Sequence, residues 1–168
     1  MAIFYLDTSA ILKRYRTENG TDFVSELYEQ LGAHDLLLTS HFACLEFECV
    51  AARALKAKLL TPAAYNMLLG GLARDIGEYL LLMPVASELV NDAIEVTRRF
   101  ELRAPDAIHV AAAQQGDRTV QGGQFVFVTS DKELLAASNM AGMTTLDPES
   151  EHALDSLREL RRRGGNNG

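Results

Sequence analysis

The amino-acid sequence predicts an α/β protein, an α/β/α sandwich with a central, mostly parallel sheet and helices on both faces. Short apolar runs alternate along the chain with longer segments whose apolar residues recur at helical spacing, as in folds where each strand is followed by a helix. The apolar runs are unbroken instead of alternating with polar residues, which indicates strands that are covered on both faces.

The apolar runs give the expected strands. They are residues 3–6, 35–40, 79–85, 125–128 and, as a short last strand, 143–146. Pro84 has no backbone N–H to donate, so the third strand is expected to lie at an edge of the sheet or to end there.

The segments between the strands give the expected helices. They are residues 9–16, 21–31, 40–59, 61–76, 87–100, 105–115, 130–142 and 148–163, with a loop over 116–123. Ser40 is expected as an N-cap, and Thr61 followed by Pro62 marks another helix start. Ser130 and Glu133 have the spacing of a capping box, which predicts that a helix begins where the fourth strand ends.

The length and composition indicate one soluble domain. A chain of 168 residues can bury a sizeable core but is short for two domains, so we expect a single domain over residues 1–163 and a disordered tail over 164–168. The 48% of hydrophobic and 23% of charged residues are ordinary for a globular protein. No apolar run approaches the roughly 20 residues of a membrane span, and the layout of a signal peptide is absent. We therefore expect a cytoplasmic protein with no membrane partner.

The charge balance is acidic. The 23 acidic and 16 basic residues give a net charge of −7. A phosphate-binding protein more often carries a basic surplus, so the total by itself argues weakly against a nucleic-acid partner. A group of metal-binding carboxylates would account for part of the acidity.

The cysteines do not suggest a metal site. Cys44 and Cys49 are five residues apart in one expected helix, a spacing that places them on different sides of it. We expect both to be small core residues, with no disulfide and no zinc site.

Two acids follow expected strands directly. Asp7 comes after the first strand, and Asp131 comes shortly after the strand of residues 125–128. In an open parallel sheet, functional residues gather beyond the carboxyl ends of the strands. Each acid has an alternative role at a turn or helix start, where a carboxylate is favoured by the helix dipole.

Glu46 is an acid on a largely apolar helix stripe. Its neighbours on the stripe are Phe42, Ala43, Cys49 and Val50. A carboxylate in such surroundings is usually paired, protonated or bound to a metal, and Arg53, two turns further on, is the ordinary partner. Glu48 is a rival acid on a neighbouring face, and Glu46 is preferred because of its stripe.

Asp106 lies in the first turn of an expected helix that begins at Pro105. The rest of this helix is small and apolar over residues 107–113, which indicates burial. An acid at this place is either a partner of the helix dipole or a site residue. His109, on the same side, is expected to be a hydrogen-bonded core residue rather than a ligand.

The four acids together predict a metal site if the fold brings them to one place. Two carboxylates about 4 Å apart repel by roughly 4 kcal/mol at an effective dielectric constant near 20, so several such pairs require a cation. Oxygen ligands without a pair of Cys or His suit Mg²⁺ or Mn²⁺ better than Zn²⁺. A site of this kind activates water and stabilises a phosphoryl group in transit.

A basic group near the first acid could hold a phosphodiester backbone. It comprises Lys13, Arg14 and Arg16. The alternative is an ordinary solvated helix C-terminus, where basic residues are favoured without any ligand.

Four blocks of this sequence resemble the PIN domain, and more narrowly the VapC-type toxins of toxin–antitoxin pairs. The blocks are "YLDTSA", Ser40 with Glu46, "PDAIHVAAA" and "FVTSDKELLAAS…AGM". They occur in the order and approximate spacing of that family, and the resemblance extends from Ile3 to about Pro148. "LDTSA" alone would be a weak signal, and the four blocks in order are a strong one.

The resemblance implies a PIN-like fold and a Mg²⁺- or Mn²⁺-dependent ribonuclease that cleaves RNA phosphodiesters with metal-activated water. It implies that Asp7, Glu46, Asp106 and Asp131 form the catalytic and metal-binding quartet. Members of the family commonly form homodimers and are inhibited by a small cognate antitoxin.

The resemblance also implies supporting roles for three hydroxyl residues, Thr8, Ser40 and Thr129. Whether Thr8 and Ser9 contact substrate or only cap the next helix is left open by the sequence. The chain departs from the family pattern at Ala104–Pro105, where a Thr-Leu pair is more usual, and in a longer 116–123 loop and C-terminal helix.

Other functions fit less well. An aspartyl-phosphate enzyme of the haloacid dehalogenase class needs a second acid two residues after Asp7, where this chain has Ser9. A receiver domain usually has an adjacent acid pair after its first strand, and Tyr5–Leu6 precede Asp7 here. A non-catalytic PIN-like binding or regulatory domain is the more serious alternative, although such a protein has no reason to keep four mutually repelling acids.

Overall fold

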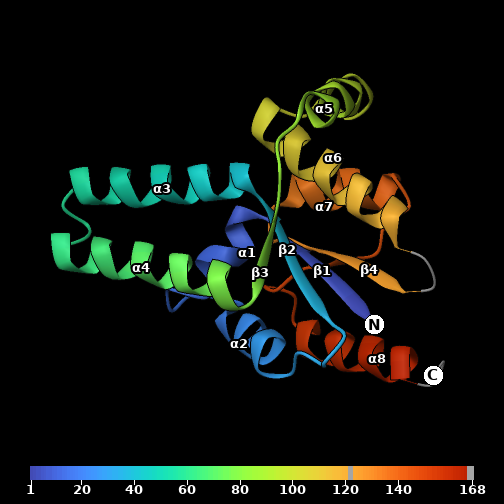
Figure 1. The fold of residues 1–168 in the computed structure, drawn as a ribbon, viewed down its shortest axis with the longest axis horizontal. Helices are drawn as coiled ribbons and strands as arrows, with labels where there is room; N and C mark the ends of the chain where they lie inside the picture. Colours follow the sequence, from blue (N-terminus) through green and yellow to red (C-terminus); the bar gives the residue numbers. More distant parts are fainter. Residues whose placement is uncertain (121–122, 166–168) are drawn as a thin grey trace.

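The computed structural model describes residues 1–120 and 123–165, and a parallel sheet forms the centre of this part of the chain (Figure 1). The strands are β1 (Ala2–Leu6), β2 (Leu36–Ser40), β3 (Leu80–Met83), β4 (Gln124–Val128) and β5 (Thr145–Leu146). They form a five-stranded sheet in the order β3-β2-β1-β4-β5, and every pairing is parallel. The predicted sheet is confirmed, and β3 lies at an edge as expected.

Helices cover both faces of the sheet. They are α1 (Thr8–Leu12), α2 (Thr21–Glu29), α3 (His41–Lys56), α4 (Pro62–Glu78), α5 (Ser87–Phe100), α6 (Ala104–Thr119), α7 (Lys132–Met140) and α8 (Ala153–Gly165). In Figure 1, α5, α6 and α7 lie above the sheet, while α2 and α8 lie below it. The α/β/α sandwich predicted from unbroken apolar strands is therefore confirmed.

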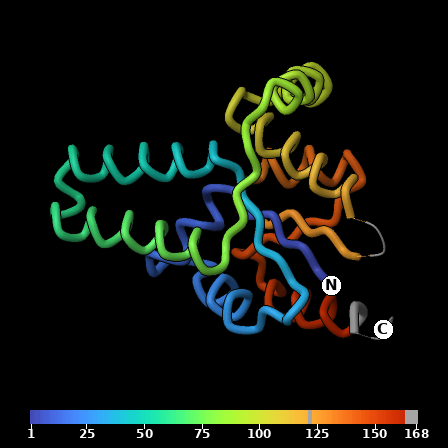
Figure 2. Tube along the Cα trace, in the orientation of Figure 1, coloured from blue at the N-terminus to red at the C-terminus, as the bar shows by residue number. Residues whose placement is uncertain are grey.

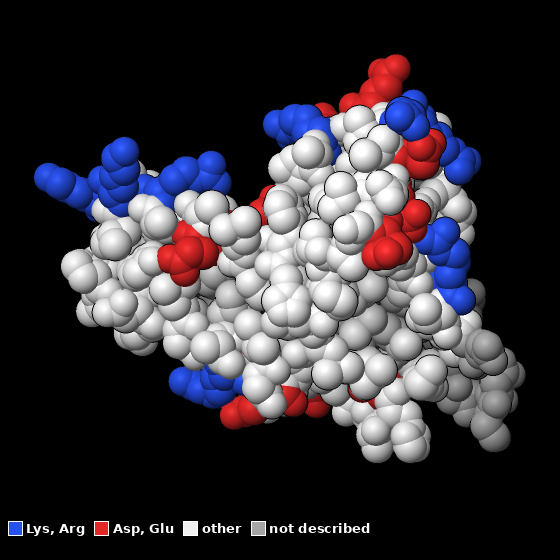
Figure 3. Space-filling view, turned by 45° about the horizontal axis from the view of Figure 1, so that its top comes forward, with Lys and Arg blue, Asp and Glu red and all other residues white. Residues whose placement is uncertain are grey.

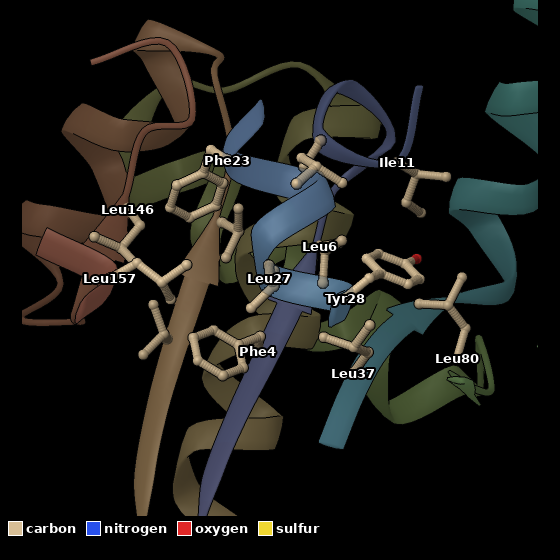
Figure 4. Close-up of a cluster of buried hydrophobic side chains, with 14 of the residues drawn as sticks. Phe4, Leu6, Ile11, Phe23, Leu27, Tyr28, Leu37, Leu80, Leu146 and Leu157 are labelled. Carbon is tan, nitrogen blue, oxygen red and sulfur yellow. The ribbon is translucent and has the colours of Figure 1, made fainter. Parts of the chain in front are cut away.

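The side chains of β1 divide the core into two halves. Phe4 and Leu6 point to one face of the sheet, where they join a cluster of residues from α1, α2, α3, α4 and α8 (Figure 4). Ile3 and Tyr5 point to the opposite face and pack against α5, α6 and α7. Because both faces are buried, β1 has no position for an exposed polar residue until the strand ends at Leu6.

Two helix starts differ from the expectation. The cap of α7 is Asp131 and not Ser130, because an Asp131 carboxylate oxygen accepts hydrogen bonds from the backbone N–H groups of Glu133 and Leu134. Helix α8 begins at Ala153 instead of residue 148. Backbone hydrogen bonds from Ser150 to Asp147 and from Ala153 to Ser150 form turns that occupy the interval.

Helix ends also differ, for example α3 ends at Lys56 and not at residue 59. Helix α1 stops at Leu12 and not at residue 16. Helix α6 continues to Thr119, so residues 116–119 of the expected loop are helical, while 121–122 lie outside the described residues. Helix α8 extends to Gly165, which corrects the first part of the predicted disordered tail, and 166–168 are outside the described residues.

The cysteine prediction is wrong for one of the two residues. Both are free thiols, but Cys44 is only half-buried and Cys49 is exposed. Cys49 faces outward because it lies on the same side of α3 as Glu46 and Val50, which line a cavity described below. Separately, none of the helices in the described part of the chain is long and apolar enough to cross a membrane.

Helices α3 and α4 form an antiparallel hairpin that extends to one side of the sheet (Figure 2). A side chain on Gly71 of α4 would place its Cβ 2.9 Å from Cε1 of Tyr15. The Tyr15 ring cannot easily move, because it packs edge-on against Phe47 and its hydroxyl donates to Asp75 over 2.7 Å. The close approach of α4 to the Tyr15 ring at Gly71 thus fixes the position of the hairpin at its base.

Two adjacent glycines of α4 provide a matched test of this packing. Gly70 has open space around its Cα, so Gly70→Ala should raise the free energy of unfolding by about 0.5–1 kcal/mol through helix propensity. Gly71→Ala should lose that gain and lower the free energy of unfolding, because the methyl group meets the Tyr15 ring. Urea denaturation measures both, and an equal gain at the two positions would contradict the packing described.

Candidate functional site

A cavity of about 370 Å³ lies beyond the ends of β1 and β4, with residues of α1, α3, α6 and α7 in its walls. All four predicted acids, Asp7, Glu46, Asp106 and Asp131, line it. Asp7 directly follows β1, and Asp131 lies three residues beyond β4 as the cap of α7. Glu46 projects from α3, and Asp106 from the first turn of α6. The fold therefore brings together residues that are widely separated in the sequence.

Asp7 is held by a dense set of hydrogen bonds and is only 3% exposed. Its Oδ1 accepts from the Ala10 backbone N–H at 2.8 Å and from the Ser9 hydroxyl at 2.8 Å. Its Oδ2 accepts from the Thr129 hydroxyl at 2.7 Å. Burial raises the pKa of the Asp7 carboxyl above its ordinary value, and these hydrogen bonds only partly offset this effect.

The hydroxyl groups around Asp7 also connect β1 to β4. Thr129 Oγ1, which donates to Asp7, accepts the backbone N–H of Asp131 at 3.1 Å. Ser9 Oγ, on the other side of Asp7, accepts the backbone N–H of Ser130 at 3.1 Å. The supporting hydroxyl of Thr129 therefore ties the two strand-end acids into one arrangement.

Glu46 is held by different partners. One oxygen, Oε2, accepts from the Thr8 hydroxyl at 2.5 Å and lies 2.7 Å from His109 Nε2. An ionised carboxylate can only accept, so Nε2 carries the proton in this interaction. Burial opposes ionisation of Glu46, but the hydrogen bonds from His109 and Thr8 outweigh it and lower the pKa of the carboxyl. His109, not Arg53, is thus the close partner of Glu46.

A buried chain of polar groups supports His109 from below. The Tyr5 hydroxyl lies 3.0 Å from His109 Nδ1, and in the neutral ring this nitrogen accepts the Tyr5 proton. Ser40 is close enough to Tyr5 to counteract part of the rise in its pKa that burial causes. Ser40 does not line the cavity; its side-chain oxygen accepts the Ala43 backbone N–H, so that it caps α3.

Asp106 is more exposed to solvent than Asp7. Its Oδ2 lies 3.4 Å from Nε of the exposed Arg103. Burial raises the pKa of the Asp106 carboxyl, and the negative charge of Asp131 raises it further. This direction indicates that Asp106 and Asp131 repel each other across the cavity.

Residues 4–140 match the PIN domain family. The chain belongs to this family. None of the curated proteins compared with it matches.

Solved structures with the same fold include toxin–antitoxin proteins. VapBC2 from Rickettsia felis, bound to a DNA fragment from its promoter, has a TM-score of 0.62 at 11% identity, covering 86% of this chain and 98% of that chain. VapBC-1 from nontypeable Haemophilus influenzae has a TM-score of 0.63 at 13% identity, covering 88% and 99%. VapC20 from Mycobacterium tuberculosis, a Sarcin-Ricin loop cleaving toxin, has a TM-score of 0.60 at 15% identity, covering 80% and 94%. At these identities the likeness shows the PIN fold alone.

The donor chemistry of the PIN domain cavity fits a hard divalent cation. The four carboxylates supply only oxygen ligands, which Mg²⁺ and Mn²⁺ prefer. The repulsion evident in the raised pKa of Asp106 is also the kind that a cation relieves. In residues 1–120 and 123–165, however, no three His, Cys, Asp or Glu side chains are already grouped as a metal-binding set. The acids share the walls of the cavity without forming a tight cluster.

The basic group predicted to hold a phosphodiester lies elsewhere in the PIN domain. Lys13 is 3% exposed, and its Nζ pairs with carboxylate oxygens of Glu149 at 2.6 Å and Glu18 at 3.3 Å. This corrects the prediction for Lys13, because a buried and doubly paired ammonium group has no free surface for a phosphate. Lys13 directly follows the short α1 as its C-cap, and the Lys13 side chain is buried.

The two neighbouring arginines are also paired and do not line the cavity. Arg14 pairs with Asp75 at 3.5 Å and lies over the Tyr28 ring. Arg16 pairs with Glu18 at 3.7 Å. Their predicted interaction with RNA therefore has no support from their position.

Three residues that the sequence did not predict as site residues also line the cavity. Arg53 lines the cavity, as do His109 and Ser9. The helical spacing of Glu46 and Arg53, seven residues apart on one face of α3, was the available signal for Arg53. The rival acid Glu48 faces α4, where its Oε1 accepts a hydrogen bond from the Tyr65 hydroxyl.

Replacing His109 tests the buried polar chain. His109→Phe should lower the free energy of unfolding by about 1–3 kcal/mol, because the Tyr5 hydroxyl would be left buried without its partner. His109→Gln, which retains a donor for Glu46, should lose less. Urea denaturation in EDTA measures both variants without any contribution from metal.

A second substitution serves as the control. Tyr5→Phe added to His109→Phe should recover part of the lost stability, since removing both partners of a buried hydrogen bond costs less than removing one. If His109→Phe is as stable as the wild-type protein, the hydrogen bond between Tyr5 and His109 does not hold the site together.

Proposed function

We propose that this PIN domain protein is a Mg²⁺- or Mn²⁺-dependent endoribonuclease and the toxin of a toxin–antitoxin pair. The observation that carries the proposal is the convergence of Asp7, Glu46, Asp106 and Asp131 on one cavity at the carboxyl end of a PIN sheet. A purely structural role does not account for four acids facing one cavity, because burial of Asp7 and repulsion between Asp106 and Asp131 both oppose their ionisation.

Asp7, Asp106 and Asp131, with Glu46, would hold the metal ion. When bound, the ion supplies activation of water and neutralises the charge that develops on a phosphodiester. Each acid needs a fixed orientation for this role, which neighbouring residues provide: Thr129 and the Ala10 N–H hold Asp7, and Thr8 and His109 hold Glu46. In this proposal Ser9 orients Asp7 and Thr8 orients Glu46 by hydrogen bonds. Thr129 supports the site in the same way, through its hydrogen bond to Asp7.

The comparisons support the toxin assignment and the partners. The similar structures include VapBC complexes and a "Toxin-antitoxin complex from Klebsiella pneumoniae", at 16% identity with a TM-score of 0.55. One of the similar proteins is described as a Sarcin-Ricin loop cleaving toxin, which supports RNA as the substrate class. We therefore propose a cognate antitoxin and an RNA substrate for this chain, and a homodimer formed by its single domain of residues 1–163.

Cleavage of RNA tests the proposed activity. The purified protein, free of antitoxin, should cleave structured RNAs with Mg²⁺ or Mn²⁺ and not in EDTA. Asp7→Asn and Glu46→Gln should lower the rate by more than about 100-fold, since even the partners of metal ligands are worth 10–100-fold. The reaction is followed by gel electrophoresis of end-labelled RNA.

Glu48→Gln is the matched control for the helix acid, because Glu48 lies on another face of α3 and bonds to Tyr65. It should cleave at nearly the wild-type rate. If wild type cleaves no RNA, or if Asp7→Asn cleaves equally well, the protein is a non-catalytic PIN domain instead.

Thermal unfolding tests the metal site independently of cleavage. Mn²⁺ at about 100 times its Kd should stabilise the fold by about 2.7 kcal/mol, which corresponds to roughly 5–10 °C in Tm for a chain of this size. Asp106→Asn should reduce that shift, because it removes one carboxylate from the cavity.

Asp117→Asn is the control, since Asp117 belongs to the same helix and is exposed outside the cavity. It should retain the full shift. An unchanged Tm of the wild-type protein up to millimolar Mn²⁺ would contradict the proposed site.

A further inference from the structure

The outer part of the α3–α4 hairpin is basic, in contrast to the rest of the chain. Residues 49–74 contain no Asp or Glu, although the whole chain has 23 acids against 16 bases. The bases of this segment are Arg53, Lys56, Lys58 and Arg74. Figure 3 shows basic side chains along the α3 edge of the hairpin. This acid-free region is thus adjacent to the acidic cavity.

One face of α3 leads from the cavity to these bases. Glu46 and Arg53 both line the cavity, and they are seven residues apart, or two helical turns. Lys56 follows Arg53 at a spacing of three residues and therefore lies on the same side of the helix. With a rise of 1.5 Å per residue, Arg53 lies about 10 Å and Lys56 about 15 Å beyond Glu46 along the axis. Lys58 follows two residues after the end of the helix.

The cations of this row make no ion pair within the described part of the chain. Arg53, Lys56 and Lys58 are all exposed, and in the described part of the chain none of them takes part in an ion pair, unlike Lys13, Arg14, Arg118 and Arg158. Arg53 Nε donates a hydrogen bond to the Cys49 carbonyl of its own helix, and its charge helps to lower the pKa of the Glu46 carboxyl without forming an ion pair with it. Three positive charges thus remain available to a partner in a protein with a net charge of −7.

We infer that Arg53, Lys56 and Lys58 form a binding surface for the phosphate backbone of RNA, which runs from the cavity outward along α3. The inference rests on the proposed function, because it places the scissile phosphodiester in the cavity. A single strand carries a charge at every nucleotide, so it can occupy the cavity and reach Arg53 and Lys56 at once. An acidic protein segment would need carboxylates in the same continuous order to make these contacts.

This surface replaces the basic group that the sequence suggested. Lys13 is buried against Glu18 and Glu149, so it cannot serve the same purpose. The row on α3 differs in being exposed, unpaired within the described residues and continuous with the cavity wall.

Salt-dependent RNA binding tests the inference. The Asp7→Asn protein keeps the RNA intact, and its binding to a fluorescein-labelled single-stranded RNA of about 12 nucleotides is followed by anisotropy at increasing NaCl. Adding Lys56→Ala and Lys58→Ala should reduce the slope of log K against log salt by about 1.4, because each phosphate that the protein no longer neutralises lowers it by about 0.7. The Kd at 0.1 M salt should rise on the order of tenfold, and the difference should shrink towards 1 M salt. Glu46→Gln provides a second inactive parent if Asp7→Asn fails to fold.

The matched control is the pair Arg118→Ala and Arg162→Ala. Both residues are exposed bases on other helices, so the pair changes the net charge equally. It should leave the slope and the Kd nearly unchanged. An equal loss of RNA affinity in the two double variants, or no loss of affinity in the Lys56 and Lys58 variant, would overturn the inference. So would tighter binding of a polyglutamate peptide than of RNA, with the same dependence on Lys56 and Lys58, which would identify an acidic protein as the partner.

The binding experiment and the cleavage experiment distinguish a failure of this surface from a failure of the proposed function. If no RNA is cleaved but binding depends on Lys56 and Lys58, the surface stands and the nuclease fails. If RNA is cleaved while the Lys56 and Lys58 variant binds as its parent does, the nuclease stands and the surface fails.

Discussion

The parallel pairing of β1 with β4 is the constraint on which the site depends. Leu6 pairs with Val128 in register, so the residues that follow, Asp7 and Thr129, leave the sheet side by side. The 2.7 Å hydrogen bond from Thr129 to Asp7 then forms across the two strand ends. A shift of this register by one residue would turn the strand side chains to the opposite faces. The site therefore depends on the same register that fills the core.

The buried polar chain of Tyr5, His109 and Glu46 fixes the orientation of Glu46 by hydrogen bonds. Tyr5 lies on the face of β1 that packs against α6, and its hydroxyl meets His109 from that helix. His109 in turn meets Glu46 from α3. Three elements are thus connected through one imidazole, and each of these polar groups has a partner, as buried groups require. The orientation of Glu46 is a consequence of core packing as much as of the cavity itself.

The fold also places an acidic region and a basic region beside each other. The acids that face the cavity raise the local negative charge; burial raises the pKa of Asp7 and of Asp106, and the charge of Asp131 raises that of Asp106 further. The hairpin that borders the cavity contains no acid over residues 49–74. Acidic and basic regions are therefore placed next to each other, and the net charge of −7 conceals this arrangement.

The sequence by itself determined the layered α/β fold, because unbroken apolar strands and helical periodicity are local patterns. It also singled out Asp7, Glu46, Asp106 and Asp131, because parallel strands gather such acids at one edge of the sheet and because the four blocks resemble the PIN domain, and all four line one cavity. Only the tertiary structure decided which partners these acids have. Asp131 rather than Ser130 caps α7, His109 rather than Arg53 meets Glu46, and Lys13 turns inward to Glu149. The partners of Glu46 and Lys13 are far from them in the chain, and periodicity and spacing carry no information about such interactions; the cap of α7 is a local choice between two adjacent residues that are both suited to it.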